Sequence, residues 1–99
     1  MINTERKCRI AAAIRAYLNG DDLTPEEETA PQGDIISAGR AFDELACDRC
    51  AMEKIAFAIL LFDKGETMVK AADKCYISYA TAKRWKRQIV ELVDRWLPE

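Results

Sequence analysis

The 99-residue sequence contains no histidine, only four glycines and three prolines, and no long apolar run. Without histidine the chain lacks the side chain most often used as a general base. No Gly-rich phosphate loop and no recognisable nucleophile motif occurs either, so we expect no enzymatic activity. The scarcity of glycine and proline, with no low-complexity tract, argues against global disorder.

The longest apolar stretch, "IAFAILLF" at 55–62, is far too short to cross a bilayer. At the N-terminus, Arg15 interrupts the apolar residues, and no small-residue cleavage site follows them. These features predict a cytoplasmic protein that does not enter a membrane. In that compartment the four cysteines are expected to be thiols.

Strong helix formers dominate the composition, and the Val–Thr alternation typical of strands is absent. The sequence therefore predicts an all-α fold of about five helices in a single domain, 1–99. Within it, 1–33 form an N-terminal helix and an acidic linker, and 34–99 form the helical core. The expected helices cover 4–18, 34–47, 49–65, 67–75 and 79–97.

Short polar residues mark the predicted helix starts. Asp34, Asp48 and Ser78 each precede an apolar pattern and are predicted to be N-caps. Gly65 is predicted to end the third helix. That helix is apolar nearly all round from Ile55 to Phe62, so we expect it to be the most buried element.

Charge is unevenly distributed along the chain, although the formal net charge is only −2. Residues 21–48 contain nine acidic side chains and one basic one, a balance of −8. Residues 67–89 contain six basic side chains and one acidic one, a balance of +5. This asymmetry predicts a basic working face at the C-terminal end of an acidic protein.

The last two predicted helices, at about 67–97, have the pattern of a helix-turn-helix. Ala72 provides the small residue that two steeply crossing helices need, and Ile77 can fill the corner between them. Ser78 can cap the second helix, which is long enough to be a recognition helix. Ala82, Trp85 and Ile89 recur at helical spacing and should face inward.

The opposite face of the second helix is mostly cationic, which suits a helix that enters the major groove of duplex DNA. Arg84 and Arg87 are the predicted guanine readers. The predicted base or groove contacts are Tyr79, Ala80, Thr81, Lys83, Arg84 and Arg87. The predicted phosphate contacts are Lys70, Lys74 and Lys86.

The segment "MEKIAFAILLFDKGETMVKAADKCYISYATAKRWKRQIVEL", 52–92, resembles the promoter-reading C-terminal domain of sigma factors and related small phage regulators, including late-gene antiterminators and activators. The shared pattern is an apolar helix, a Gly-containing turn, an Ala-centred helix, an apolar-plus-Ser corner and a basic recognition helix. Tyr76 stands at the corner position that is commonly glycine, and Ala82 replaces a usual β-branched residue. The resemblance implies sequence-specific binding of double-stranded DNA, alongside RNA polymerase, by a phage-type transcription regulator.

Three alternatives remain open from the sequence. The chain could be a helical protein-interaction module, such as an RNA-polymerase-binding adaptor, that docks a partner through its C-terminal apolar stripe. Trp96 and Leu97 either pack on the first helix or form the seam of a homodimer. The "CDRC" pair, Cys47 and Cys50, would need Cys8 and Cys75 or carboxylates to hold zinc. Because cysteines three apart on a helix more often pack as small apolar residues, we predict no metal and no cofactor.

Overall fold

The computed structural model describes residues 3–19 and 31–97. Within these ranges the chain forms helices and turns and no strand, which confirms the predicted all-α class. The elements are α1 (Thr4–Asn19), α2 (Gln32–Leu45), α3 (Ala51–Ala58), the π-helical segment η2 (Ile59–Asp63), α4 (Met68–Lys74) and α5 (Tyr79–Trp96). Most of the predicted acidic linker lies outside the described residues.

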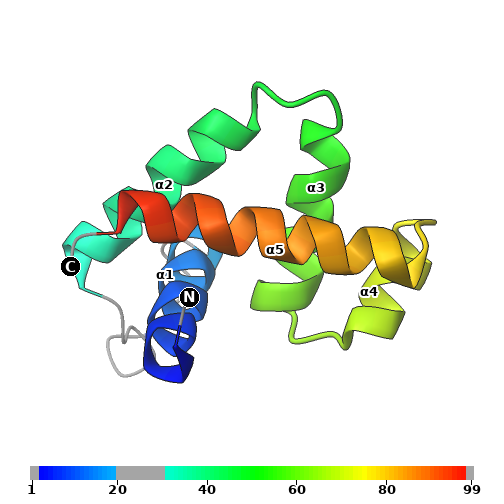
Figure 1. Ribbon diagram of the computed structural model, residues 1–99, viewed down its shortest axis with the longest axis horizontal. Coiled ribbons are helices and arrows are strands. Elements are labelled where there is room, and N and C mark those ends of the chain that lie inside the picture. Colours follow the sequence, from blue (N-terminus) through cyan, green and yellow to red (C-terminus); the bar gives the residue numbers. More distant parts are fainter. Residues whose placement is uncertain (1–2, 20–30, 98–99) are drawn as a thin grey trace.

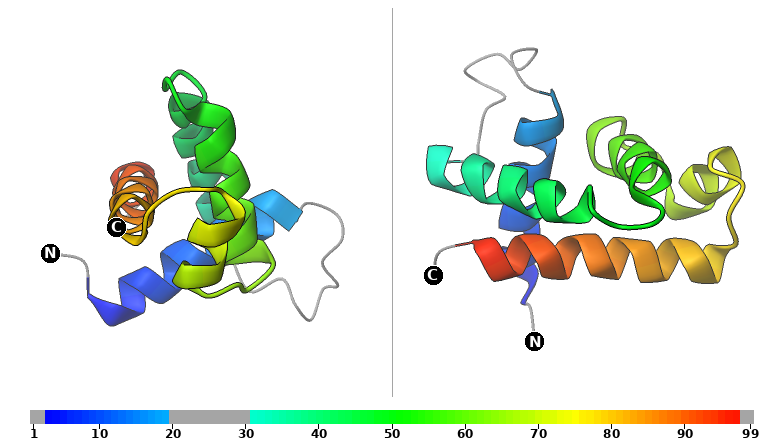
Figure 2. Two further views of the ribbon diagram at one scale, coloured as in Figure 1. Left: turned by 90° about the vertical axis from the view of Figure 1, so that its right-hand side faces the viewer. Right: turned by 90° about the horizontal axis from the view of Figure 1, so that it is seen from above.

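Helix α5 runs the length of the molecule and contacts all the other α-helices (Figure 1). With 18 residues it is about 27 Å long at about 1.5 Å per residue. Helices α1 and α2 pack against its C-terminal half, whereas α4 lies beside its N-terminal end (Figures 1 and 2). One end of α5 is thus embedded in the fold and the other projects with α4.

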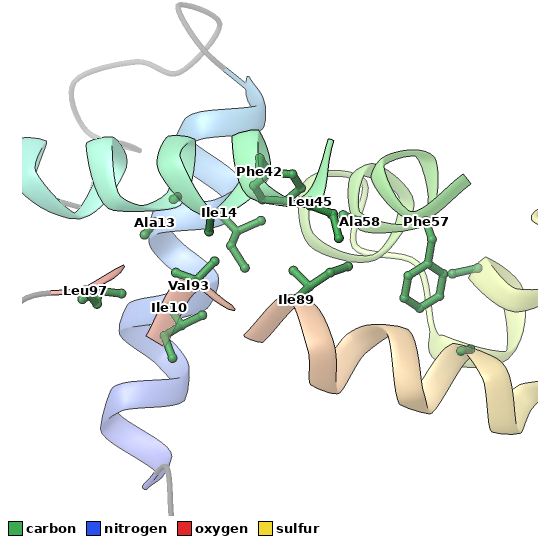
Figure 3. Close-up of a cluster of buried hydrophobic side chains, with 14 of the residues drawn as sticks. Ile10, Ala13, Ile14, Phe42, Leu45, Phe57, Ala58, Ile89, Val93 and Leu97 are labelled. Carbon is green, nitrogen blue, oxygen red and sulfur yellow. The ribbon is translucent and has the colours of Figure 1, made fainter. Parts of the chain in front are cut away.

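The hydrophobic core lies where α1, α2 and α5 meet (Figure 3). Ile10 and Ile14 of α1, Phe42 of α2, and Ile89 and Val93 of α5 are all at most 4 % exposed. A spacing of four residues places Ile10 and Ile14 on one face of α1, and Ile89 and Val93 on one face of α5. Full burial of such side chains stabilises a fold by roughly 1.5–3 kcal/mol each.

The expectation that the third helix is the most buried element is wrong. Helix α3 buries Phe57 and Ala58 and the aliphatic stem of Lys54, whereas the side chains of η2 are only partly buried. The apolar residues of this segment point in all directions, and the small fold covers only some of them. At the end of η2, Gly65 has a φ of +71°, in agreement with its predicted role as the end of the helix.

Asp34 does not cap α2, so that prediction is wrong. The helix begins earlier, with Pro31 at the N-cap, and Asp34 lies in the first turn at 1 % exposure. Its carboxylate accepts two hydrogen bonds from the Arg9 guanidinium, from Nε at 2.7 Å and from Nη2 at 2.8 Å. This bidentate pair joins α1 to α2, and it raises the pKa of Arg9.

Asp48 also has a different role from the one predicted. The N-cap of α3 is Cys50, whose backbone N–H donates to Asp48 Oδ1 at 3.0 Å. Asp48 Oδ2 lies 3.0 Å from Lys54 Nζ and accepts from Gln88 Nε2 at 3.3 Å. Lys54 Nζ donates to Gln88 Oε1 at 2.8 Å, so the three side chains form a closed Asp48–Lys54–Gln88 triad.

The triad connects the α2–α3 turn, α3 and the middle of α5. The hydrogen bond from Cys50, followed by those from Lys54 and Gln88, lowers the pKa of Asp48 to about 2. The carboxylate is therefore ionised throughout the neutral range. Lys54, only 8 % exposed, is thereby provided with a counter-charge.

Candidate nucleic-acid interface

The predicted helix-turn-helix region maps onto α4, a four-residue turn and α5. The N-cap of α4 is Thr67, whose Oγ1 accepts a hydrogen bond from Lys70 N at 3.2 Å. Helix α5 begins at Ser78, whose Oγ accepts from Thr81 N at 3.1 Å, which confirms the predicted cap. Each helix start thus has one otherwise unpaired backbone donor satisfied by a side chain.

The turn between the helices has the hydrogen bonds of a Schellman motif. Ile77 N donates to Ala72 O at 3.0 Å, and Tyr76 N donates to Asp73 O at 3.2 Å. Tyr76 occupies the left-handed position of the motif with a φ of +56°. A side chain with a Cβ costs about 1 kcal/mol there relative to glycine.

Small residues allow α4 and α5 to approach closely. Ala71 and Ala72 of α4 and Ala82 of α5 are all at most 4 % exposed. Ile77, in the turn, is partly buried and packs against the hydrophobic core of which these alanines are part. Ala71 was not among the expected inward residues, although the Ala71–Ala72 pair could have suggested it.

The predicted contact residues of α5 lie on its outer side. At 100° per residue, Ala80, Lys83, Arg84 and Arg87 share the face opposite Ala82, Ile89 and Val93. Thr81 is only partly exposed, at the edge of this face, and Lys70 and Lys74 are exposed on α4. We call the exposed cations Lys83, Arg84 and Arg87, together with Lys86 at their flank, the basic face of α5.

Several of these cations have partners within the protein. Lys74 Nζ lies 2.7 Å from Glu66 Oε1, and this contact lowers the pKa of Glu66. Lys83 Nζ is 5.7 Å from the centroid of the Tyr79 ring, a cation–π distance. The Glu66 contact was not predicted from the sequence, because Glu66 precedes α4 and lies eight residues from Lys74, outside the spacing of neighbours on one helix.

The basic face is supported from behind by Trp85. Its ring meets Phe57 edge-on, with centroids 6.0 Å apart and an interplanar angle of 80°. Lys54 Nζ lies 5.9 Å from the Trp85 ring, and Gln88 of the triad follows one turn later on α5. The N-terminal half of α5 is therefore held at a fixed angle to α3.

No family model, no curated protein and no solved structure matches this chain. An assignment of function therefore rests on the geometry and charge of the residues themselves.

The C-terminal apolar stripe of α5 consists of Ile89, Leu92, Val93 and Trp96. Ile89 and Val93 are buried within the fold, Leu92 is half-buried, and Trp96 is 40 % exposed. Trp96 packs on α2 rather than on α1, because its Nε1 donates to Glu44 Oε2 at 3.0 Å and its ring lies 5.7 Å from the Arg40 guanidinium.

The cysteines show no arrangement typical of a metal centre. Cys8 and Cys47 are exposed and Cys50 is half-buried, while burial raises the pKa of the Cys75 thiol. Across residues 3–19 and 31–97, no three histidine, cysteine or acidic side chains come close enough together to hold an ion. None of the helices in these ranges is long and apolar enough to span a bilayer.

Proposed function

We propose that α4, the turn and α5 form a helix-turn-helix that binds duplex DNA, and that the protein is a phage-type transcription regulator. The observation that carries this proposal is the exposed basic face of α5 beside a compact two-helix corner. In such a complex α5 enters the major groove by its N-terminal half, while α4 crosses the phosphate backbone. The embedded C-terminal half fixes the angle at which α5 projects.

The residue types along α5 support this orientation. Ala80 leaves room near the start of the helix, where the backbone approaches the base edges most closely. Arg84 and Arg87 are long enough to pair with O6 and N7 of guanine. Lys83 can reach a base edge or a phosphate from the same face.

In the proposed complex, Lys70, Lys74 and Lys86 contact the phosphates. Lys74 already binds a carboxylate oxygen of Glu66, and a phosphate oxygen can take the place of that partner. With these three contacts and a fourth from Lys83, the logarithm of the affinity should fall against the logarithm of salt concentration with a slope of about −3 to −4. The acidic remainder of the chain should suppress binding away from this face.

The resemblance to sigma-factor domains supports RNA polymerase as a second partner in the cytoplasm. A protein-interaction module without DNA readout has less support, because it requires the C-terminal apolar stripe to be available. Ile89 and Val93 are already covered by the protein itself, and Trp96, the most exposed residue of the stripe, is hydrogen-bonded to Glu44 of α2.

Selection from a pool of random duplexes tests the proposal. The natural chain is compared with Lys83→Glu/Arg84→Glu/Arg87→Glu on the basic face of α5. The control is Lys7→Glu/Arg15→Glu/Arg49→Glu, which makes the same change in net charge at exposed positions elsewhere. Circular dichroism verifies that both variants are folded.

We expect the natural chain and the control to enrich one sequence motif, and the basic-face variant to lose it. Weak retention without any motif by all three proteins would refute sequence-specific DNA binding.

A further inference from the structure

Tyr76 combines an unfavourable backbone conformation with a side chain that makes little contact with the protein. Among the described residues it alone, apart from glycine, has a positive φ. Its side chain is 96 % exposed, the largest value among the exposed large hydrophobic residues. Packing in the folded protein therefore does not account for a tyrosine at this position, where glycine would relieve the strain.

The location of Tyr76 suggests an external role. It lies in the turn, two residues before the Ser78 cap and three before Tyr79, whose half-exposed ring contacts Lys83. The Schellman hydrogen bonds on either side hold its backbone in place. An exposed phenol is thus held at the end of α5 from which the basic face begins.

Tyrosine has suitable chemistry for a nucleic-acid backbone. Its hydroxyl can donate to a phosphate oxygen, and its side chain has few rotatable bonds, so little conformational freedom is lost on binding. A neutral donor also differs from lysine or arginine, because it adds a contact without displacing a bound counterion.

We propose that Tyr76 contacts DNA, its phenol hydroxyl donating a hydrogen bond to a phosphate of the duplex on which α5 docks. This inference rests on the proposed function. It accounts for a tyrosine at a strained position: replacing Tyr76 by glycine would relieve the backbone strain but would weaken the complex with DNA.

The experiment uses the full chain and the duplex obtained by the selection above, or a mixed-sequence duplex if no motif is enriched. Tyr76→Gly should raise the Tm by roughly 3–8 °C, because glycine tolerates the left-handed conformation. The same substitution should weaken DNA binding about tenfold, the effect of losing one hydrogen bond to a charged acceptor. Stability and affinity are thus expected to change in opposite directions.

Tyr76→Phe separates the hydroxyl from the ring. It should lose affinity by about the same factor with an unchanged Tm. In both variants the salt dependence of binding should keep the natural slope, whereas Lys86→Gln should reduce its magnitude by about 1. Tyr17→Phe, which removes the hydroxyl of a partly exposed tyrosine in α1, is the matched control and should bind as the natural chain does.

Natural affinity in Tyr76→Gly would overturn the inference and leave the proposed function intact. Natural affinity in Tyr76→Phe, with a loss only in Tyr76→Gly, would overturn the role of the hydroxyl. If the natural chain binds no duplex at all, both the inference and the proposed function fail.

Discussion

The two halves of α5 belong to one continuous helix but have opposite surroundings. In residues 88–96, Ile89 and Val93 are buried, and Asp94 and Arg95 pair with Arg6 and Glu44. Residues 79–87 carry the basic face, whose side chains extend into solvent. A single helix thus joins a half that is buried in the fold to a half whose cations are exposed.

Arg6 of α1 holds the C-terminal end of the embedded half through hydrogen bonds. The Arg6 guanidinium pairs with the Asp94 carboxylate and also donates to the backbone oxygens of Asp94 and Leu97, at 3.2 and 3.3 Å. These bonds satisfy carbonyls that the helix end leaves without intrahelical partners. The projecting half depends instead on caps, the Trp85–Phe57 contact and the triad.

Ile89→Ala should have the largest effect of the substitutions considered. It removes a fully buried side chain from the embedded half, and we expect a loss of about 2–5 kcal/mol in the free energy of unfolding. Chemical denaturation measures this loss. DNA affinity, measured where the variant is still folded, should stay within about twofold of the natural value; a larger loss would mean that the halves do not act separately.

Arg87→Ala should weaken DNA binding and leave stability nearly unchanged, the opposite of Ile89→Ala. Loss of a guanine contact should weaken binding to the selected site by about 1–3 kcal/mol and relax the preference at one base pair. The Tm should be nearly unchanged, because the side chain is exposed. Binding titrations against single-base variants of the site measure both effects.

Arg95→Ala is the matched control on the same helix. Its exposed pair with Glu44 contributes at most about 1 kcal/mol to stability, and DNA affinity should not change. Equal losses of affinity in Arg87→Ala and Arg95→Ala would contradict the division of α5.

Ser78→Ala should have a smaller effect, confined to stability. Without the hydroxyl that accepts from Thr81 N, we expect a loss of about 1 kcal/mol in the free energy of unfolding. Ser78→Asp should restore the cap, and thermal melting of both variants checks it. Equal stability of Ser78→Ala and the natural chain would show that the cap is dispensable.

Asp48→Asn should lower stability at neutral pH, and this difference from the natural chain should disappear in acid. The folded-state pKa of about 2 lies below the ordinary value of 3.8, so ionised Asp48 stabilises the natural fold above about pH 4. This contribution is lost as pH falls from about 4 to 2. Between about pH 4 and 2 the Tm of Asp48→Asn should therefore fall less than the Tm of the natural chain. Melting curves at several pH values measure both. An equal fall of Tm in the two proteins would contradict a role for Asp48 ionisation.

The local features of the fold were predictable from the sequence, and the long-range polar contacts were not. Helix positions follow from spacing of apolar residues, and the Ser78 cap follows from a residue type at a helix start. The Asp34–Arg9 pair joins residues 25 positions apart, and the triad joins Asp48 to Gln88. Both carboxylates fitted a local cap, and only the packing of distant helices gives them other partners.

For the candidate site, the sequence predicted which cations would be exposed on α5 but not the contacts between them. The pairing of Lys74 with Glu66 depends on how the residues before α4 lie relative to the last turn of that helix. The exposed position of Tyr76 likewise follows from the turn geometry, although its occurrence at a customary glycine position was visible beforehand.

Each half of α5 also contains one of the two tryptophans. Trp85 lies behind the basic face, against Phe57 and the Lys54 ammonium, while Trp96 lies under Arg40 at the embedded end. The protein therefore carries an intrinsic fluorescent reporter at each end. With Trp85→Phe and Trp96→Phe, each emission can be followed alone, and fraying of one end can be distinguished optically from unfolding of the whole without an attached dye.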